Sequence, residues 1–383
     1  AGNSVVLGTA FEAIRRSLDA MSKTFGGVVL VWNGIFTNGV NQDTLQYILN
    51  TQKDLLDFVY DLVNPATVNH DGLTGEDNLY NELDLRQREN QVAVMNQLQR
   101  VKLTIIAIQA ANDRSPSNEL ESLIVDAKLA ADGSPPLTTY TSRLRSGVEP
   151  ASPNEKWLFI NGIANEFVWF QRSCDKIRDT FGREVKGIYN RTDGILWDLI
   201  ECAGERQAVA PDPRNPLIQR TSSSKEAQES LLEELKSAIW PGAGPAPRRV
   251  MMIAHSQGCL VLRLALQALI TANHQGDKES DLKKLGIFTF GNPSVDWKVV
   301  INGKEQPLSK YVGVTEHFAL EHDYVAKLGV IRDGSSPNPG YGTDLVFKMN
   351  GGRGHLLGAH YSFDSNAYVQ GSQSQLLRAA QRP

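Results

Sequence analysis

The sequence predicts an α/β protein: a mostly parallel sheet with helices on both faces, preceded by a largely helical N-terminal region. From residue 156 onward, apolar runs of strand length alternate with helical patterns, as in sheets that are covered on both sides. Before residue 150, apolar residues instead recur every three or four positions. The chain has 383 residues, long for one domain. We therefore expect a helical region at 1–150 and an α/β domain at 151–383, joined through the polar stretch 134–156.

Three apolar stripes predict the helices of the N-terminal region. Their residues are, in order, Leu45, Leu49, Leu56 and Val59; Val94, Leu98, Val101, Ile105 and Ile108; and Leu120, Leu123, Ile124 and Ala127. The first stripe ends at Asn64-Pro65, because proline disfavours helical backbone in the residue before it. These helices either pack within the chain or offer a surface for a protein partner or for self-association.

Six buried strands are predicted in the α/β domain, each with strand-length apolar character. They lie at 157–163, 185–190, 248–254, 285–293, 311–323 and 344–350. Helical patterns begin near Phe167, at Ser222 and after Gly258. A long loop at 203–222 contains three prolines, and long loops in compact domains are often functional. We expect this loop to lie over the functional site.

Composition excludes several classes of function. The net charge of −4 gives no basic surface for nucleic acid. No apolar run approaches the roughly 20 residues of a transmembrane helix. Cys174, Cys202 and Cys259 form no disulfide framework and have no metal-type spacing. The pairs His317/His322 and His355/His360 lack a third metal ligand at a suitable spacing. No glycine-rich phosphate loop follows a strand, so neither a metal nor another cofactor is expected. Localisation stays open between the cytoplasm and export after removal of a leader.

The stretch MMIAHSQGC, residues 251–259, has the pattern of a nucleophile elbow. A buried strand is followed by small-x-Ser-x-Gly and then by an apolar helix. Ala254 and Gly258 allow the strand and the helix to approach closely, and the Ser256 hydroxyl projects from the carboxyl edge of the sheet. The backbone N–H of Gln257 begins the helix, where it can stabilise a negative oxygen.

A serine nucleophile needs a base and an orienting carboxylate, which follow it in the order acid, then histidine, on this type of fold. Asp323 ends a predicted strand and is the first candidate for the acid, with Asp296 as the alternative. His355 and His360 remain as candidates for the base, in a glycine-rich loop that we expect to run into a helix. A second oxyanion donor is expected from the N–H of Ile163, after the strand that begins the domain.

Three motifs occur in the order of a known family. AHSQGCLVLRLAL, FTFGNPSVD and EHDYVAKLG resemble the nucleophile, following-strand and acid motifs of class 3-type lipases in the α/β-hydrolase superfamily. The resemblance covers residues 156–365 and implies Ser256 as nucleophile, Asp323 as acid and His360 as base. Two positions depart from it. Ala254 replaces the first elbow glycine, and Asn-Gly-Ile stands where many hydrolases have His-Gly before the oxyanion loop.

These observations together predict a serine esterase or lipase without a cofactor, acting on a carboxylic ester or a lipid-like substrate. His360 is preferred as the base because the bulky Tyr361 and Phe363 follow it and anchor the segment, whereas glycines precede His355. The alternative function is a catalytically silent protein of hydrolase fold that uses its helical region to bind a partner. Reaction with a covalent serine probe distinguishes the two hypotheses.

Overall fold

The computed structural model of the chain describes residues 50–70, 77–112, 139–192, 194–195, 198, 202, 222–332 and 336–380. Leu45, Leu49 and the third N-terminal stripe lie outside these residues, as does nearly all of the loop predicted at 203–222.

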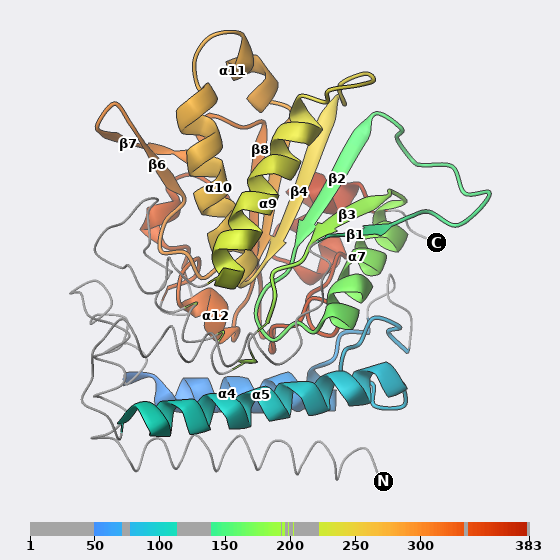
Figure 1. Cartoon of the computed structure of the whole chain (residues 1–383), viewed down its shortest axis with the longest axis vertical. Helices are drawn as coiled ribbons and strands as arrows, with labels where there is room; N and C mark the ends of the chain where they lie inside the picture. The colour runs from blue at the N-terminus through green and yellow to red at the C-terminus, as the bar shows by residue number, and fades with distance from the viewer. Residues whose placement is uncertain are drawn as a thin grey trace.

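The central sheet of the described chain has seven strands in the order β1-β3-β2-β4-β5-β8-β9 (Figure 1). Neighbouring strands from β3 to β9 run parallel, and only the edge strand β1 is antiparallel to its neighbour β3. The strands are β1 (Thr139–Ser142), β2 (Glu155–Ile160), β3 (Val185–Ile188), β4 (Arg249–His255), β5 (Leu285–Phe290), β8 (Val314–Leu320) and β9 (Leu345–Met349). The predicted α/β class with a mostly parallel sheet is therefore confirmed, as are all six predicted strands.

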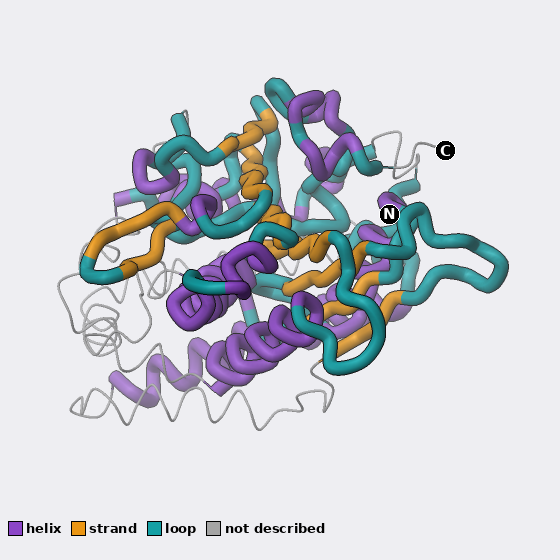
Figure 2. The backbone as a smooth tube through the Cα atoms, turned by 90° about the horizontal axis from the view of Figure 1, so that it is seen from above, coloured by secondary structure: helices purple, strands orange, loops and turns teal. Residues whose placement is uncertain are grey.

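Side chains alternate between two apolar cores, one on each face of the sheet. In β4, Val250, Met252 and Ala254 join the core formed with α9 and α10, whereas Met251 and Ile253 face the core on the other side. This period of two is what strands buried on both faces require. Figure 2 shows helices on both sides of the strands.

Three helices of the α/β part follow the predicted patterns: α7 (Phe167–Phe181), α9 (Ser222–Ile239) and α10 (Gln257–Asn273). The shorter α11 (Asp277–Leu282), α12 (Tyr324–Lys327) and α13 (Gln375–Arg378) were not predicted. Helix α7 ends where Gly182 adopts a left-handed conformation with φ of 63°, a common glycine C-terminal signal. Helix α10 is buried along almost its whole length.

The sequence analysis also missed three strands. Strand β1 lies within the stretch 134–156 that was interpreted as a connector, so that interpretation is wrong for Thr139–Ser142. The other two, β6 (Lys298–Ile301) and β7 (Lys304–Pro307), form a hairpin. All three strands have only four residues, and the polar TYTS and KEQP segments of β1 and β7 lack the apolar pattern of a buried strand.

The described part of the N-terminal region contains α4 (Gln52–Val63), the short helix η1 (Pro65–Thr67) and α5 (Arg88–Asn112). Helix α4 ends at Asn64, the position that the sequence predicts. Both long helices cross the lower end of the molecule in Figure 1, where α4 contacts α12 and α5 contacts α7. No helix in the described residues combines the length and the apolar character needed to cross a bilayer.

Candidate active site

Ser256 stands at the turn between β4 and α10 in a strained backbone conformation. Its φ of 59° and ψ of −129° lie in a region that residues with a Cβ atom rarely adopt. Such strain costs on the order of 1–3 kcal/mol and persists only when the surroundings enforce it. Here the Ser256 N–H donates to the Phe290 carbonyl at 2.8 Å, which holds the turn against β5. The predicted elbow geometry is thus present.

The loop after β2 lies directly against Ser256. A Cβ atom on Gly162 would be 2.0 Å from the Ser256 Cβ, so only glycine allows this approach. The Ile163 N–H points at the Ser256 Oγ, with 3.5 Å between the nitrogen and the oxygen. Gln257, the other predicted oxyanion donor, is the first residue of α10. The Ile163 N–H is therefore directed at the hydroxyl, and the Gln257 N–H lies at the N-terminus of the helix that follows it.

We predict that Gly162→Ala lowers kcat by at least about 100-fold, because the added methyl group must displace either the loop or the Ser256 side chain, and displacements of about 1 Å cost that much. Gly242→Ala is the matched control, since a Cβ atom there has no neighbour within 4 Å. Turnover of a short nitrophenyl ester would measure both variants. Full activity in Gly162→Ala would contradict the assigned contact.

Asp323 follows β8 and is completely buried. Its Oδ1 accepts the Val325 N–H at 2.9 Å, so the side chain caps α12. Its Oδ2 accepts two hydrogen bonds at 2.7 Å each, from His355 Nδ1 and from the Tyr361 hydroxyl. Burial, and secondarily the Asp323 charge, raises the pKa of Tyr361 well above its usual value, so the hydroxyl remains a donor. Three donors fix the carboxylate in place.

His355 is the histidine that the structure pairs with Asp323. Its Nδ1 faces the carboxylate, so Nε2 is the ring nitrogen that points away from Asp323. Nε2 is buried and makes no hydrogen bond within the described chain. The imidazole stacks on that of His255, with ring centroids 4.6 Å apart, and the edge of Phe58 packs against it at 5.9 Å between centroids. The ring orientation is thus set by Asp323 and by two aromatic neighbours.

His360, the base preferred from the sequence, has both of its nitrogens engaged elsewhere. Nδ1 accepts the backbone N–H groups of His355 and Leu356, at 3.2 and 3.0 Å, and Nε2 lies 3.0 Å from Thr67 Oγ1. Burial, together with the charges of His355 and Lys176, lowers the pKa of His360 to about 3. The ring is therefore neutral and does not contact Asp323, which moves the candidate base from His360 to His355.

The expected helix around these histidines is absent; residues 351–361 form turns and loop, and we call them the histidine loop. The glycines that seemed to weaken the position of His355 are required by this conformation. Gly351 and Gly354 have φ values of 68° and 86°. A Cβ atom on Gly354 would approach the His360 ring to 2.4 Å. The glycine run therefore shapes the loop instead of loosening it.

The end of β5 joins Ser256 to the Asp323–His355 pair. Phe290 receives the Ser256 N–H, and the next residue, Gly291, lies beside both members of the pair. A Cβ atom on Gly291 would be 2.8 Å from Asp323 Oδ2 and 3.0 Å from His355 Cε1. On the other side, the ring next to the serine, His255, donates through Nε2 to the His355 carbonyl at 2.7 Å. Ser256 and Asp323 thus follow parallel strands that end at the same edge of the sheet, and His355 is bonded to Asp323, while its Nε2 makes no hydrogen bond to Ser256.

Asp296, the alternative acid, lies away from both candidate histidines. Its carboxylate is 3.8 Å from Arg263 on α10. Asp198, a residue that the sequence did not indicate, contacts the loop after β2. Its Oδ2 accepts the Ala164 N–H at 2.8 Å, where Ala164 has a φ of 52°. No motif surrounds Asp198 that could have identified it, and only the fold brings it to the loop.

An apolar cluster lies beside the serine. It is formed by side chains from α4, the loop after β2, α10, α12 and the histidine loop, among them Phe58, Leu62, Ile163, Leu260 and Leu356. Ser256 and His355 themselves are 0% exposed, so they are reached from solution only when part of the surrounding chain moves.

Among the described residues, no group of three or more His, Cys, Asp or Glu side chains is arranged to hold a metal ion. No model of a known protein family matches the chain, and no curated protein is significantly similar to it.

Proposed function

We propose that this protein is a serine hydrolase of α/β-hydrolase type that cleaves carboxylic esters through Ser256, His355 and Asp323. The observation that carries the proposal is the 2.7 Å hydrogen bond between buried Asp323 and His355, held beside a serine in strained elbow geometry. The order of the three residues along the chain, serine, acid, histidine, is that of α/β-hydrolases. The resemblance of the sequence motifs to class 3-type lipases supports the same assignment.

In the proposed reaction, His355 Nε2 takes the proton of the Ser256 hydroxyl while Oγ attacks the ester carbonyl carbon. The negative oxygen of the tetrahedral intermediate accepts the N–H groups of Ile163 and Gln257. Asp323 stabilises the imidazolium, which then protonates the leaving alcohol. Water, activated by the same histidine, hydrolyses the acyl-enzyme. The apolar cluster around Phe58 and Leu62 favours esters with an apolar acyl chain, such as acyl-glycerols or phospholipids.

A fluorophosphonate probe tests the proposal directly, because it reacts only with an activated serine. We expect stoichiometric labelling, located by mass spectrometry on the peptide that contains Ser256, together with hydrolysis of nitrophenyl esters. Ser294, which is buried and donates its hydroxyl to the Asp296 carbonyl, serves as an internal control that stays unlabelled. Absence of label on Ser256 in the folded protein would refute the proposal.

The complete burial of Ser256 and His355 favours one second candidate, a binding protein of hydrolase fold that performs no turnover. In that case the N-terminal helices bind a partner, and Ser256 stays buried. The same labelling experiment separates the two functions. A folded protein that neither reacts with the probe nor cleaves esters would be assigned to the second candidate.

We predict that Asp323→Asn lowers kcat by about 10⁴-fold, because a neutral amide neither holds the His355 tautomer nor stabilises the imidazolium. The amide keeps the size of the side chain, so we expect the fold to remain intact. Asp296→Asn is the matched control, since that carboxylate lies beside Arg263 and away from the candidate histidines. Turnover and thermal melting of both variants would be compared. A larger loss of turnover in Asp296→Asn would show that Asp296, and not Asp323, is the acid.

A further inference from the structure

Four residues from the segment between α4 and α5 form hydrogen bonds to the histidine loop. Thr67 Oγ1 bonds to His360 Nε2, and the Asn69 N–H donates to the Ala359 carbonyl at 2.6 Å. Asn78 Nδ2 donates to the Gly358 carbonyl at 3.0 Å, and Glu82 Oε1 accepts the Gly358 N–H at 2.9 Å. We call Thr67, Asn69, Asn78 and Glu82 the clamp. Its contacts reach a loop almost 300 residues away in the sequence.

The hydrogen bonds assign the tautomer of His360. Because Nδ1 accepts two backbone N–H groups, it carries no proton, and the proton of the neutral ring is on Nε2. Nε2–H therefore donates to Thr67 Oγ1. The Thr67 hydroxyl in turn donates to a backbone carbonyl of its own turn, either Asp61 at 2.8 Å or Asn64 at 2.7 Å. A directed chain thus runs from the backbone of His355 through His360 to the clamp.

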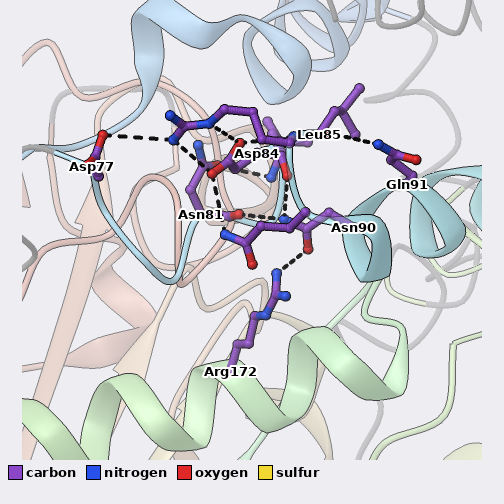
Figure 3. A network of polar contacts seen from close by, with 10 residues as sticks. Asp77, Asn81, Asp84, Leu85, Asn90, Gln91 and Arg172 are labelled. Atoms are coloured by element: carbon purple, nitrogen blue, oxygen red, sulfur yellow. Dashed lines mark hydrogen bonds and ion pairs between the residues drawn. The ribbon is translucent and has the colours of Figure 1, made fainter.

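The clamp has a firm base. Figure 3 shows the turns that precede α5, where Asn90 connects them to α7. Asn90 Nδ2 donates to the carbonyls of Asn81 and Asp84 at 2.9 and 3.0 Å, and its Oδ1 accepts from Trp169 and Arg172. The clamp is therefore tied to a helix that packs directly on the sheet.

Helix α7 also holds the loop from its other side. The ammonium group of Lys176 is buried and donates to the carbonyls of Leu357, Gly358 and Tyr361, at 2.8, 3.3 and 2.7 Å. Gly358 is thus held from both sides, by Lys176 and by the clamp. These bonds hold a stretch that has no helix or strand of its own to fix it.

We infer that the N-terminal clamp acts as a positioning element for His355, with His360 as the residue that transmits its hold. The inference rests on the proposed function in assigning His355 as the base. His360 receives the N–H groups of His355 and Leu356, and so fixes the backbone from which the base projects. Loss of this hold lets the imidazole rotate away from Asp323 and Ser256, and rates fall steeply with such misplacement.

Paired substitutions at Thr67 test the clamp. Thr67→Val keeps the shape but removes the acceptor of the His360 Nε2–H, whereas Thr67→Ser retains a hydroxyl. We expect Thr67→Val to lower kcat by about tenfold with KM changed by less than about threefold, because the site is misaligned while substrate contacts persist. Thr67→Ser should keep kcat within about twofold of the unmodified protein. Equal kcat values for the two variants would overturn the inference.

A second pair tests His360 itself. The amide of His360→Asn can place an oxygen where Nδ1 accepts the two backbone N–H groups, whereas His360→Leu leaves both unpaired. We expect kcat to fall by about 100-fold in His360→Leu and at least about tenfold less in His360→Asn. Equal and complete loss in both variants would overturn the positioning role, because a proton-transferring base cannot be replaced by an amide.

One readout does not depend on activity. The Cε1–H signal of His355 in ¹H–¹³C NMR spectra, assigned through its absence in His355→Ala, reports the ring environment directly. We expect this signal to move in Thr67→Val and to keep its position in Thr67→Ser. If the unmodified protein neither hydrolyses esters nor reacts with the probe, the proposed function fails while this measurement still decides the clamp. An unmoved signal in Thr67→Val would refute the clamp by itself.

Discussion

Replacement of Ser256 by alanine is expected to lower the turnover of nitrophenyl esters by about 10⁶-fold, the loss typical of a removed triad nucleophile. The reason is chemical: alanine leaves the oxyanion donors of Ile163 and Gln257 in place but provides no atom that can form the acyl-enzyme. What remains is hydrolysis through binding and oxyanion stabilisation alone. Steady-state kinetics with a purified variant would measure the loss.

The backbone of Ser256 supplies the control for this experiment. Alanine keeps the Cβ atom and therefore the strain at φ of 59°, so Ser256→Ala should fold like the unmodified protein. Ser256→Gly removes the Cβ atom and should melt at a higher temperature than Ser256→Ala, because glycine adopts positive φ without a clash. A Ser256→Ala variant that kept turnover within tenfold would show that another residue is the nucleophile.

Replacement of His355 by alanine is expected to cost about as much as loss of the nucleophile, also near 10⁶-fold in kcat. Without the imidazole, the proposed triad has lost its base, and Asp323 keeps the described donors Tyr361 and Val325. The fluorophosphonate reaction should fail in the same variant, since it needs the same activated serine. Both the hydrolysis rate and the rate of labelling would be measured.

His360→Ala is the comparison that gives the His355 experiment its meaning. It removes the hydrogen bonds of His360 to the backbone and to Thr67 but leaves the proposed base, His355, in place, so its loss should be nearer to 100-fold. Residual labelling of Ser256 by the probe is expected in His360→Ala and none in His355→Ala. The opposite ranking would restore His360 as the base and remove the role assigned to the Asp323–His355 hydrogen bond.

The six apolar strands of the sheet, the elbow and Asp323 could be placed from the sequence because their signals are local. The run from Val250 to Ala254 is apolar at every position, and it reads as a strand buried on both faces before any contact is known. Small residues around Ser256 indicate the tight turn. Parallel strands align their carboxyl ends, so Asp323, which follows β8, had to lie near the elbow.

The choice between the histidines could not be made in this way. Local reasoning took the glycines before His355 as flexibility and the aromatic residues after His360 as anchorage. The conformation is instead decided by distant partners, because Glu82 and Lys176 hold the same short stretch of chain from two sides. One signal was present in the sequence: His355 stands closer than His360 to Met349, where the last strand ends.

The edge of the sheet shows the same limit. Strand β1 is polar, and only its hydrogen bonds to Val185–Ile188 make it a strand. An edge position asks for no continuous apolar run, so composition cannot distinguish such a segment from a loop.

The neutral histidines of this fold couple its stability to proton uptake. Burial lowers the pKa of His255 and His317, as well as that of His360, which falls from 6.5 to about 3. Their full contribution is present above pH 6.5, where folded and unfolded chains alike leave them unprotonated. Below that pH these imidazoles bind protons in the unfolded chain but stay unprotonated in the folded chain. The free energy of unfolding therefore falls by up to about 1.4 kcal/mol per pH unit for each histidine. Glu82 and Glu316, whose pKa values burial raises, oppose this trend, since their contribution is present in acid and lost as the pH rises. The burial that holds His360 in the histidine loop therefore also lowers the free energy of unfolding in mild acid.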